Sequence, residues 1–207
     1  MPTQPSSFQQ FVRTLGRVHE SVHGDGLGIL SRVIVTCKQM LADRGCSSVQ
    51  CPDDINQAID AGGTPALRGV TPSGKIDVYI HAEDKVGIKF ARSVMESYAP
   101  DDNVCIIIVS LEGPTPFTRK ECEGKNIQFM LVKDVCVNKT RHQLVPKHTK
   151  VDSPPHGIAV DNLPKIMDTD PIVQYYNFPR GSILKVERVF GGHEMVPYFR
   201  VVTAANI

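Results

Sequence analysis

The chain is poor in features that would restrict its function. Its 207 residues include no tryptophan, which by itself excludes no class of protein. A net charge of +1 excludes a surface that attracts nucleic acid throughout, so any DNA contact must come from a local patch. No apolar run approaches the roughly 20 residues that a membrane-spanning helix needs. Residues 1–10 are polar and lack the apolar core of a secretory signal, so we expect neither a membrane partner nor a secretory route.

Cysteine is present at six positions. Without a secretory route we expect these side chains to be reduced thiols. Cys46 and Cys51 have a spacing compatible with half a zinc site, but the second half would need another close pair of Cys or His. Cys105 lies inside a β-branched run that is typical of a buried strand. We therefore expect buried or incidental thiols, and no metal ion or other cofactor.

The composition is that of an ordinary globular protein, with 41% hydrophobic and 22% charged residues. This length suits one large domain or two small ones. Apolar residues at helical spacing predict helices over residues 6–20 and 30–43, and Gly45 stands where a C-cap glycine belongs. Residues 52–74 are rich in Gly, Pro and Asp and predict a loop with only a short helix, over 55–61.

The middle of the chain predicts an α/β layer. Residues 75–81 and 85–90 are expected to form two strands of a hairpin around Glu83-Asp84. Residues 103–110 form a continuous β-branched run, which indicates a strand covered on both faces. The remaining elements are helices over 91–98 and 115–123 and a strand over 126–132. This alternation favours parallel pairing.

The last third predicts a smaller unit of mixed α+β structure. Asp170 is a suitable helix N-cap, Pro171 fits the first helical position, and Asn177 stands where the chain must turn left-handed. Strands are expected over residues 182–190 and 195–202.

The fold class that follows combines α/β and α+β structure. We place a domain boundary near Asn138. The N-terminal domain, residues 1–138, is expected to be α/β, and the C-terminal domain, residues 139–207, a small mixed α+β unit. Residues 151–162 contain Pro154-Pro155 and cannot form a long regular helix.

The most specific signal is an ordered run of motifs in the last third. Its parts are Arg141-His142-Gln143-Leu144-Val145-Pro146-Lys147-His148, Leu163-Pro164-Lys165-Ile166, Asp170-Pro171-Ile172 with Tyr175-Tyr176, Gly181-Ser182-Ile183-Leu184-Lys185-Val186-Glu187-Arg188, and Tyr198-Phe199-Arg200. This order resembles the fifth common subunit of eukaryotic nuclear RNA polymerases, whose C-terminal module corresponds to a separate small subunit of the archaeal RNA polymerase. The resemblance covers residues 142–202 and is looser over the N-terminal two thirds.

The resemblance implies an accessory subunit with no catalytic residues and no cofactor of its own. In that family an N-terminal jaw domain with a restriction-endonuclease-like core faces downstream DNA, and a C-terminal assembly domain binds the largest subunit. The implied partners are the largest and other polymerase subunits and, weakly, downstream double-stranded DNA. No homo-oligomer and no membrane contact are implied. The implied location is the nucleus, the nucleolus for a copy dedicated to ribosomal transcription, and a cytoplasmic factory or virion for a viral copy.

Several positions depart from the family pattern and indicate a divergent member. The insert before Leu163-Pro164 is short and carries Pro154-Pro155. Asn177 replaces a glycine, and Pro179 replaces a common lysine. In the jaw, Thr115-Pro116-Phe117-Thr118 corresponds to a Thr-Pro-Ser-Ala loop.

By this resemblance, two groups of residues are candidates for contact. The DNA-proximal loop would consist of Thr115, Pro116, Phe117, Thr118, Arg119 and Lys120. The subunit interface would consist of His142, Leu144, Val145, Pro146, Lys147, His148, Arg188 and Arg200. From the residues alone, the first group is equally an exposed turn, and the second an exposed strand that Pro146 ends. Acidic neighbours of the loop predict a weak grip on phosphates.

Two other classes of function are considered. A metal-dependent nuclease needs two carboxylates to hold Mg²⁺ and a lysine to aid the water. Asp77 and Lys89 have a suitable spacing, with Lys89 expected on a strand, but Gly87 stands where the second acid belongs. The other alternative is a stand-alone transcription adaptor. We expect the following aromatic residues to fill a core rather than to stack on bases: Tyr175, Tyr176, Tyr198 and Phe199.

Overall fold

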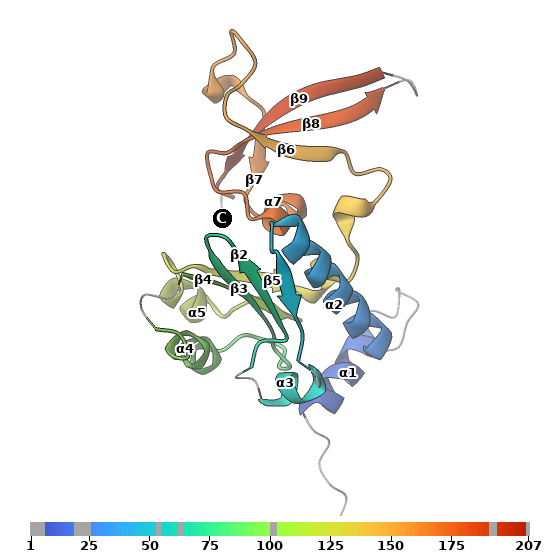
Figure 1. The fold of residues 1–207 in the computed structure, drawn as a ribbon, viewed down its shortest axis with the longest axis vertical. Coiled ribbons are helices and arrows are strands. Elements are labelled where there is room, and N and C mark those ends of the chain that lie inside the picture. The colour runs from blue at the N-terminus through green and yellow to red at the C-terminus, as the bar shows by residue number, and fades with distance from the viewer. Residues whose placement is uncertain are drawn as a thin grey trace, which may run out of the picture. The chain divides into compact units, whose positions relative to one another are not determined.

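The computed structural model describes residues 7–18, 26–52, 55–61, 64–99, 103–190 and 194–205. The chain forms two compact units, Met1–Val137 and Asn138–Ile207, each with its own sheet (Figure 1). Within the described ranges, no helix is long and apolar enough to cross a membrane. Both units mix helices with strands, as the predicted fold class requires.

The N-terminal unit is built on a five-stranded sheet in the order β1-β2-β3-β4-β5. The strands are β1 (Ser48–Gln50), β2 (Leu67–Thr71), β3 (Gly74–Ile80), β4 (Val104–Ser110) and β5 (Ile127–Leu131). Strands β1, β2 and β3 pair antiparallel, whereas β3, β4 and β5 pair parallel. The predicted parallel α/β layer is therefore confirmed for the last three strands.

Helices cover both faces of this sheet. They are α1 (Ser7–Val18), α2 (Gly26–Asp43), α3 (Ile55–Ala61), α4 (Ile88–Glu96), α5 (Pro116–Glu121) and α6 (Val132–Val135). Figure 1 shows α4 and α5 on one side of the sheet and α2 on the other. Ile106 and Ile108 of β4 pack with Val94 of α4. Because side chains alternate along a strand, Ile107 faces the opposite layer. Both Ile107 and Ile108 are 0% exposed, so β4 is the buried centre of the unit.

The predicted hairpin over residues 75–90 is wrong. Helix α4 already begins at Ile88, and in the expected second strand only Val86 makes a bridge, an isolated one to Pro114. Lys89 is consequently a helix residue and not a strand residue. The apolar residues of this segment follow helical spacing once Ile88 is taken as the start, so Phe90 and Val94 share one face.

The hairpin lies one strand earlier, between β2 and β3. It falls inside the segment that composition assigned to a loop around α3. Strand β2 contains only two large apolar residues, Leu67 and Val70, which makes its pattern weak. Its pairing is stabilised instead by a buried contact, since Arg68 lies directly opposite Asp77 in the register. A tertiary ion pair of this kind leaves no periodic signal in a sequence.

The C-terminal unit holds a four-stranded sheet in the order β6-β8-β9-β7. The strands are β6 (Lys147–Val151), β7 (Lys165–Met167), β8 (Ile183–Phe190) and β9 (Glu194–Thr203). They are joined by the helix α7 (Pro171–Tyr176) and the 3₁₀ turns η1 (Lys139–Arg141) and η2 (Val160–Asn162). Strands β6, β8 and β9 pair antiparallel, and β7 pairs parallel to β9.

The short helix α7 follows the predicted chemistry at both ends. Asp170 accepts a hydrogen bond from the Ile172 backbone N–H at 2.8 Å, and Pro171 occupies the first turn. Asn177 has a φ of 54°, so the predicted left-handed turn is confirmed. Side chains on the two faces of the sheet form separate clusters. One consists of Ile166, Val173, Leu184 and Val202, the other of Leu163, Ile183 and Val201.

Candidate functional site

The segment around His142 forms a turn ahead of β6. Asn138 caps η1 with its side chain. The Val145 N–H donates to the His142 carbonyl at 3.0 Å, and the Leu144 N–H donates to His142 Nδ1 at 3.2 Å. Pro146 therefore precedes a strand, which corrects the expectation that it ends one.

This turn presents apolar and basic side chains to solvent. Leu144 is 84% exposed, while Val145 and Pro146 are half-buried. Lys147 is exposed and lies opposite Glu187, and His148 lies opposite Val186. Neighbouring strand residues point to opposite faces, so Lys147 and His148 do not share a surface. The predicted interface residues are thus divided between the turn and the two sides of the sheet.

Arg188 and Arg200 meet at an aromatic ring on one face of the sheet. The guanidinium carbon of Arg188 lies 5.0 Å from the centroid of the Tyr198 ring, and that of Arg200 lies 5.9 Å from it. Both distances allow a cation–π interaction. Tyr198 was assigned to the core from its sequence, but it is only half-buried. Its alternation with Arg200 along one strand could have indicated this shared face.

His148 lies on the same face as this cluster. Its Nδ1 is 2.8 Å from the Pro146 carbonyl oxygen. Burial lowers the pKa of His148, and the nearby charges of Arg200 and Arg188 act in the same direction. The Pro146 carbonyl and the Asp170 carboxylate oppose that change. The ring therefore stays neutral more readily than a free histidine, as befits a side chain beside two arginines.

Residues 115–120 form the start of a helix and not a loop. The Thr115 hydroxyl caps α5 by accepting from the Thr118 N–H at 3.3 Å, and Pro116 occupies the first turn. The two threonine hydroxyls lie 2.8 Å apart. Thr118 is 0% exposed, so its side chain does not belong among those that could face DNA.

The exposed side of α5 carries mixed chemistry. Phe117 is 62% exposed, and Arg119 and Lys120 are exposed beside it. In the last residue of the helix, Glu121 pairs with Arg92 at 3.3 Å. The local excess of positive charge is therefore small, which limits the attraction to a phosphate backbone.

Asp77, the acid considered for a nuclease, is committed to an internal network. It is 0% exposed, and Arg68 holds both of its oxygens, with the closest contact at 2.8 Å. The Tyr98 hydroxyl donates to Asp77 at 2.5 Å and lies 2.6 Å from the Tyr79 hydroxyl. The hydrogen bond to Asp77 raises the pKa of Arg68, and burial followed by that same contact raises the pKa of Tyr98. With both oxygens occupied and Lys89 on a helix, this arrangement is that of a structural carboxylate.

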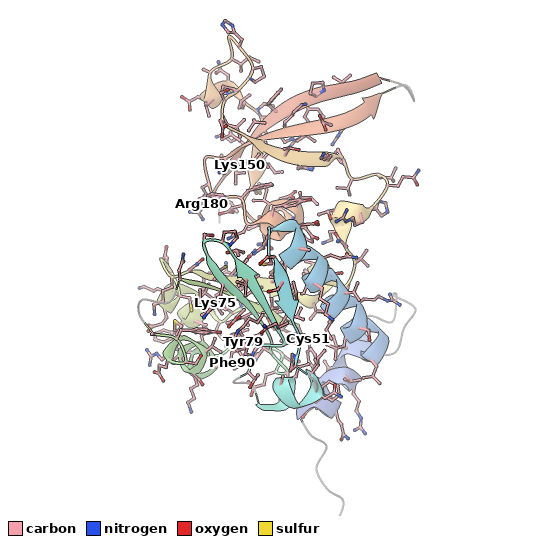
Figure 2. All side chains as sticks on the ribbon, viewed as in Figure 1. Cys51, Lys75, Tyr79, Phe90, Lys150 and Arg180 are labelled. Carbon is pink, nitrogen blue, oxygen red and sulfur yellow. The ribbon has the colours of Figure 1, made fainter. Side chains whose placement is uncertain are left out.

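An aromatic pair closes this network toward α4. The rings of Tyr79 and Phe90 meet edge-on, with centroids 6.5 Å apart (Figure 2). On its other side Phe90 contacts the His81 ring, with centroids 4.2 Å apart. Burial lowers the pKa of His81, against the opposing effects of Glu83 and the Lys85 carbonyl. The network is thus part of the packing between β3 and α4.

The cysteines are free thiols. Burial raises the pKa of Cys37 to about 12 and raises those of Cys46, Cys105 and Cys122. In the described part of the chain, no group of three or more His, Cys, Asp and Glu side chains is placed to hold a metal ion. Thiols with raised pKa values are poor nucleophiles, and these four act as small apolar groups.

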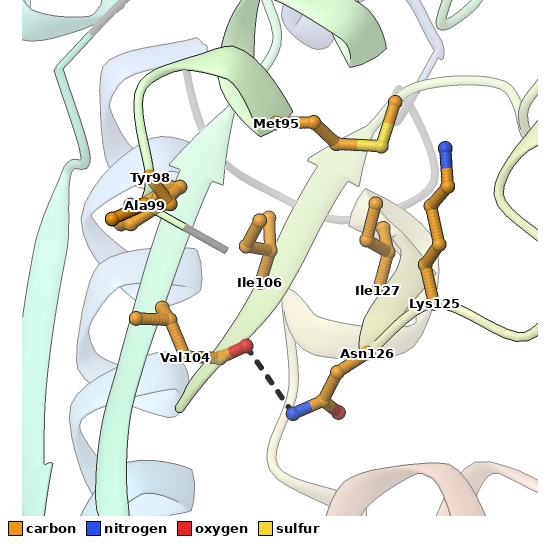
Figure 3. Close-up of a pocket in the computed structure, with 8 residues that line it drawn as sticks. All are labelled: Met95, Tyr98, Ala99, Val104, Ile106, Lys125, Asn126 and Ile127. Atoms are coloured by element: carbon orange, nitrogen blue, oxygen red, sulfur yellow. Dashed lines mark hydrogen bonds between the residues drawn. The ribbon is translucent and has the colours of Figure 1, made fainter. Parts of the chain in front are cut away.

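An open groove lies between the end of α4 and the first residues of β4 and β5. Its volume is about 440 Å³, and its lining residues are Met95, Tyr98, Ala99, Val104, Ile106, Lys125, Asn126 and Ile127 (Figure 3). Asn126 Nδ2 donates to the Val104 carbonyl at 3.2 Å, so its amide is engaged within the wall. Lys125 is the one charged side chain of the lining, which offers apolar contact but no catalytic grouping.

Comparison with known proteins connects these features. Residues 137–202 match the family model of the RNA polymerase Rpb5 C-terminal domain. The DNA-directed RNA polymerases I, II, and III subunit RPABC1 of Caenorhabditis elegans is 24% identical over 188 residues, covering 77% of this chain and 88% of the relative. The Dictyostelium discoideum subunit rpabc1 is 28% identical over 130 residues, covering 56% and 66%. The DNA-directed RNA polymerase subunit 5-like protein 1 of Arabidopsis thaliana is 25% identical over 135 residues, covering 59% and 64%.

The matched region and the architecture agree. It spans η1 and β6 through most of β9, and so takes in the turn at His142 and the arginines beside Tyr198. The low identities accord with the departures at the insert and at Asn177. The chain is a divergent member of the Rpb5 family, the fifth common subunit of eukaryotic RNA polymerases.

Proposed function

We propose that the chain is a non-catalytic subunit of a multisubunit DNA-dependent RNA polymerase that acts in the nucleus. One observation carries the proposal: the family match over residues 137–202 falls on a compact unit that begins at Asn138. The relatives are themselves named as subunits of DNA-directed RNA polymerases. A unit retained at this level of similarity is best explained by a retained binding partner, namely the other polymerase subunits.

The C-terminal unit would anchor the chain to the largest subunit. Its exposed turn offers Leu144 for apolar contact, with Val145 and Pro146 beside it. Its sheet offers Arg188 and Arg200 for charged contact. Arginine with aromatic and apolar side chains is the composition that protein interfaces favour. His142, Lys147 and His148 complete the proposed interface.

The N-terminal unit would lie near downstream DNA through the exposed side of α5. Arg119 and Lys120 could contact phosphates without reading bases, and Phe117 adds an exposed ring. Thr115 and Pro116 set the start of the helix and so its direction. With Glu121 in the same helix, such contact would be weak and would depend on the assembled enzyme for its orientation.

Purification through an affinity tag on this chain tests the proposal. We expect the two large polymerase subunits to be recovered with the full chain in stoichiometric amount. Removal of residues 140–207 should abolish that recovery, whereas the full chain with Lys38→Ala, on the exposed side of α2, should behave as wild type. Recovery of the full chain free of polymerase subunits under mild conditions would refute the assignment.

A further inference from the structure

One face of the C-terminal sheet gathers cations around a tyrosine. Strand register places His148, Val186 and Tyr198 in one row across β6, β8 and β9. Arg188 and Val196 form the next row, and residues directly opposite each other in antiparallel strands share a face. We call the exposed and half-buried members of this surface the arginine face. It consists of His148, Lys150, Arg188, Val196, Tyr198 and Arg200 (Lys150 is labelled in Figure 2).

The arginine face has no described carboxylate left to balance it. Asp170, the acid nearest to His148, already caps α7. Glu187 lies in the neighbouring register position, on the other face, where Lys185 holds it at 2.7 Å. The whole C-terminal unit contains nine Lys and Arg against six Asp and Glu, whereas the N-terminal unit contains fourteen against sixteen. The positive excess of the chain is therefore concentrated in this unit.

The tyrosine at the centre carries an unused donor. The Tyr198 hydroxyl is covered and has no hydrogen-bond partner among the described residues. A covered polar atom without a partner costs about 1–3 kcal/mol, so native structures rarely keep one without a reason. Beside it, Arg188 is exposed and contacts the ring rather than an acid. An acceptor oxygen brought by a ligand would satisfy both groups once the long arginine side chain moves aside.

We propose that the arginine face binds an acidic segment of a partner polypeptide. Arg188 and Arg200 each hold a carboxylate of that segment, and the Tyr198 hydroxyl donates to one of them. The exposed Val196, at 39%, supplies apolar contact at the edge. The inference rests on the proposed function, because the partner would be a polymerase subunit, and it adds the chemistry of the segment that docks here.

A polypeptide fits this face better than a nucleic acid does. Arginine forks match carboxylates in a bidentate geometry, and arginine with tyrosine is among the pairs most enriched at the centres of protein interfaces. A phosphate backbone is followed by a row of cations along its length. Here the two arginines instead flank one ring within 6 Å, and the only further full cation of this face, Lys150, stands on the edge strand.

Charge reversal on the full chain provides the test. Arg188→Glu with Arg200→Glu is compared with Lys75→Glu and Lys165→Glu, which change the net charge equally at exposed positions away from this face. The purified proteins are titrated with a fluorescent oligoglutamate and with duplex DNA of equal charge. We expect the arginine variant to lose at least about tenfold in peptide affinity and the lysine variant to stay within about twofold.

Tyr198→Phe separates a binding role from a structural one. It keeps the ring and removes the unpartnered hydroxyl, so we expect the Tm of the free protein to hold or rise. We expect affinity for the peptide to fall by about fivefold, since a hydrogen bond to a charged acceptor is lost. A fall in Tm with unchanged peptide affinity would overturn this role for the hydroxyl.

The remaining outcomes distinguish the two levels of the argument. If tagged wild type recovers the large polymerase subunits and the arginine variant recovers them equally, the arginine face is not the docking site, although the proposed function stands. If wild type binds oligoglutamate through Arg188 and Arg200 but recovers no polymerase subunit, the site is upheld and the proposed function fails. Tighter binding of duplex DNA than of peptide, lost in the same variant, would replace the acidic polypeptide with a nucleic acid.

Discussion

The two units of the chain solve the problem of burial differently. In the N-terminal unit, helices cover both faces of the sheet, and Ile107 and Ile108 at its centre are fully buried. In the C-terminal unit one short helix covers part of one face. Among the largest fully buried side chains of the described residues, Leu184 alone belongs to that unit. The smaller sheet keeps more of its surface in contact with solvent.

The difference in charge follows the difference in burial. In the N-terminal unit, Arg68 and Asp77 use each other, and Arg92 and Glu121 pair at the surface. In the C-terminal unit, Arg188 contacts an aromatic ring instead. A unit that satisfies its own charges can act as a scaffold, whereas one that leaves cations unbalanced on an open sheet is suited to docking. The comparison therefore assigns folding to the first unit and recognition to the second.

The sharpest test of this comparison is a cavity in the larger core. Ile108→Ala removes buried methyl groups between β4 and α4 and should lower the free energy of unfolding by about 2–5 kcal/mol. Urea denaturation measures the loss, and hydrogen exchange locates it. We expect protection to fall in the N-terminal unit alone.

The matched control for Ile108→Ala is Val35→Ala, since Val35 is 51% exposed on α2. That change should alter the free energy of unfolding by less than about 0.5 kcal/mol. Equal loss of protection in both units after Ile108→Ala would show that they unfold together, and the division into independent units would then fail.

The second test removes the charge of Asp77. Asp77→Asn leaves Arg68 without its carboxylate and weakens the contact with Tyr98. We expect a cost of about 2–3 kcal/mol, less than for a fully buried pair because the Arg68 side chain is 44% exposed and can be hydrated again. Urea denaturation against Asp84→Asn, an exposed acid in the same unit, gives the measurement. A neutral result would show that the network is dispensable for folding.

The third test uses pH on the buried histidine of the larger unit. Burial lowers the pKa of His81 below the ordinary value of about 6.5, so between these two values the unfolded chain binds a proton that the folded chain does not. Stability is therefore complete above the ordinary pKa and declines as the pH falls through that window. His81→Gln should make the dependence of Tm on pH shallower, and His156→Gln, at an exposed position, should not. Identical slopes for all three proteins would contradict the assignment.

Much of the fold could be predicted because the decisive signals are local. A β-branched run marks β4, and an acid, a proline and an asparagine mark the two ends of α7. Strand β2 escaped prediction because the contact that stabilises it, between Arg68 and Asp77, is tertiary. The segment at residues 85–90 was misjudged because a short apolar run fits a strand and a helix equally well.

The candidate sites divide in the same way. The motif order gave His142 to His148 and both arginines, since these letters are local. It could not give the exposure of Tyr198 or the burial of Thr118, which depend on how neighbouring elements pack. Residues 115–120 read as a loop because the cap and the proline come first, yet those two residues are what begins the helix.

The smallest expected effect lies on the exposed side of α5. Arg119→Ala with Lys120→Ala should leave recovery of the polymerase subunits unchanged, because neither side chain belongs to the C-terminal unit. Downstream DNA engagement by the assembled enzyme should weaken by about two- to threefold, and the salt dependence should become slightly shallower, since at most two phosphate contacts are lost. Lys38→Ala with Arg13→Ala, two exposed cations of α2 and α1, is the control. A loss of subunit recovery in the α5 variant would place assembly in the N-terminal unit and reverse the division of roles, whereas an unchanged DNA affinity would remove α5 from the path of the DNA.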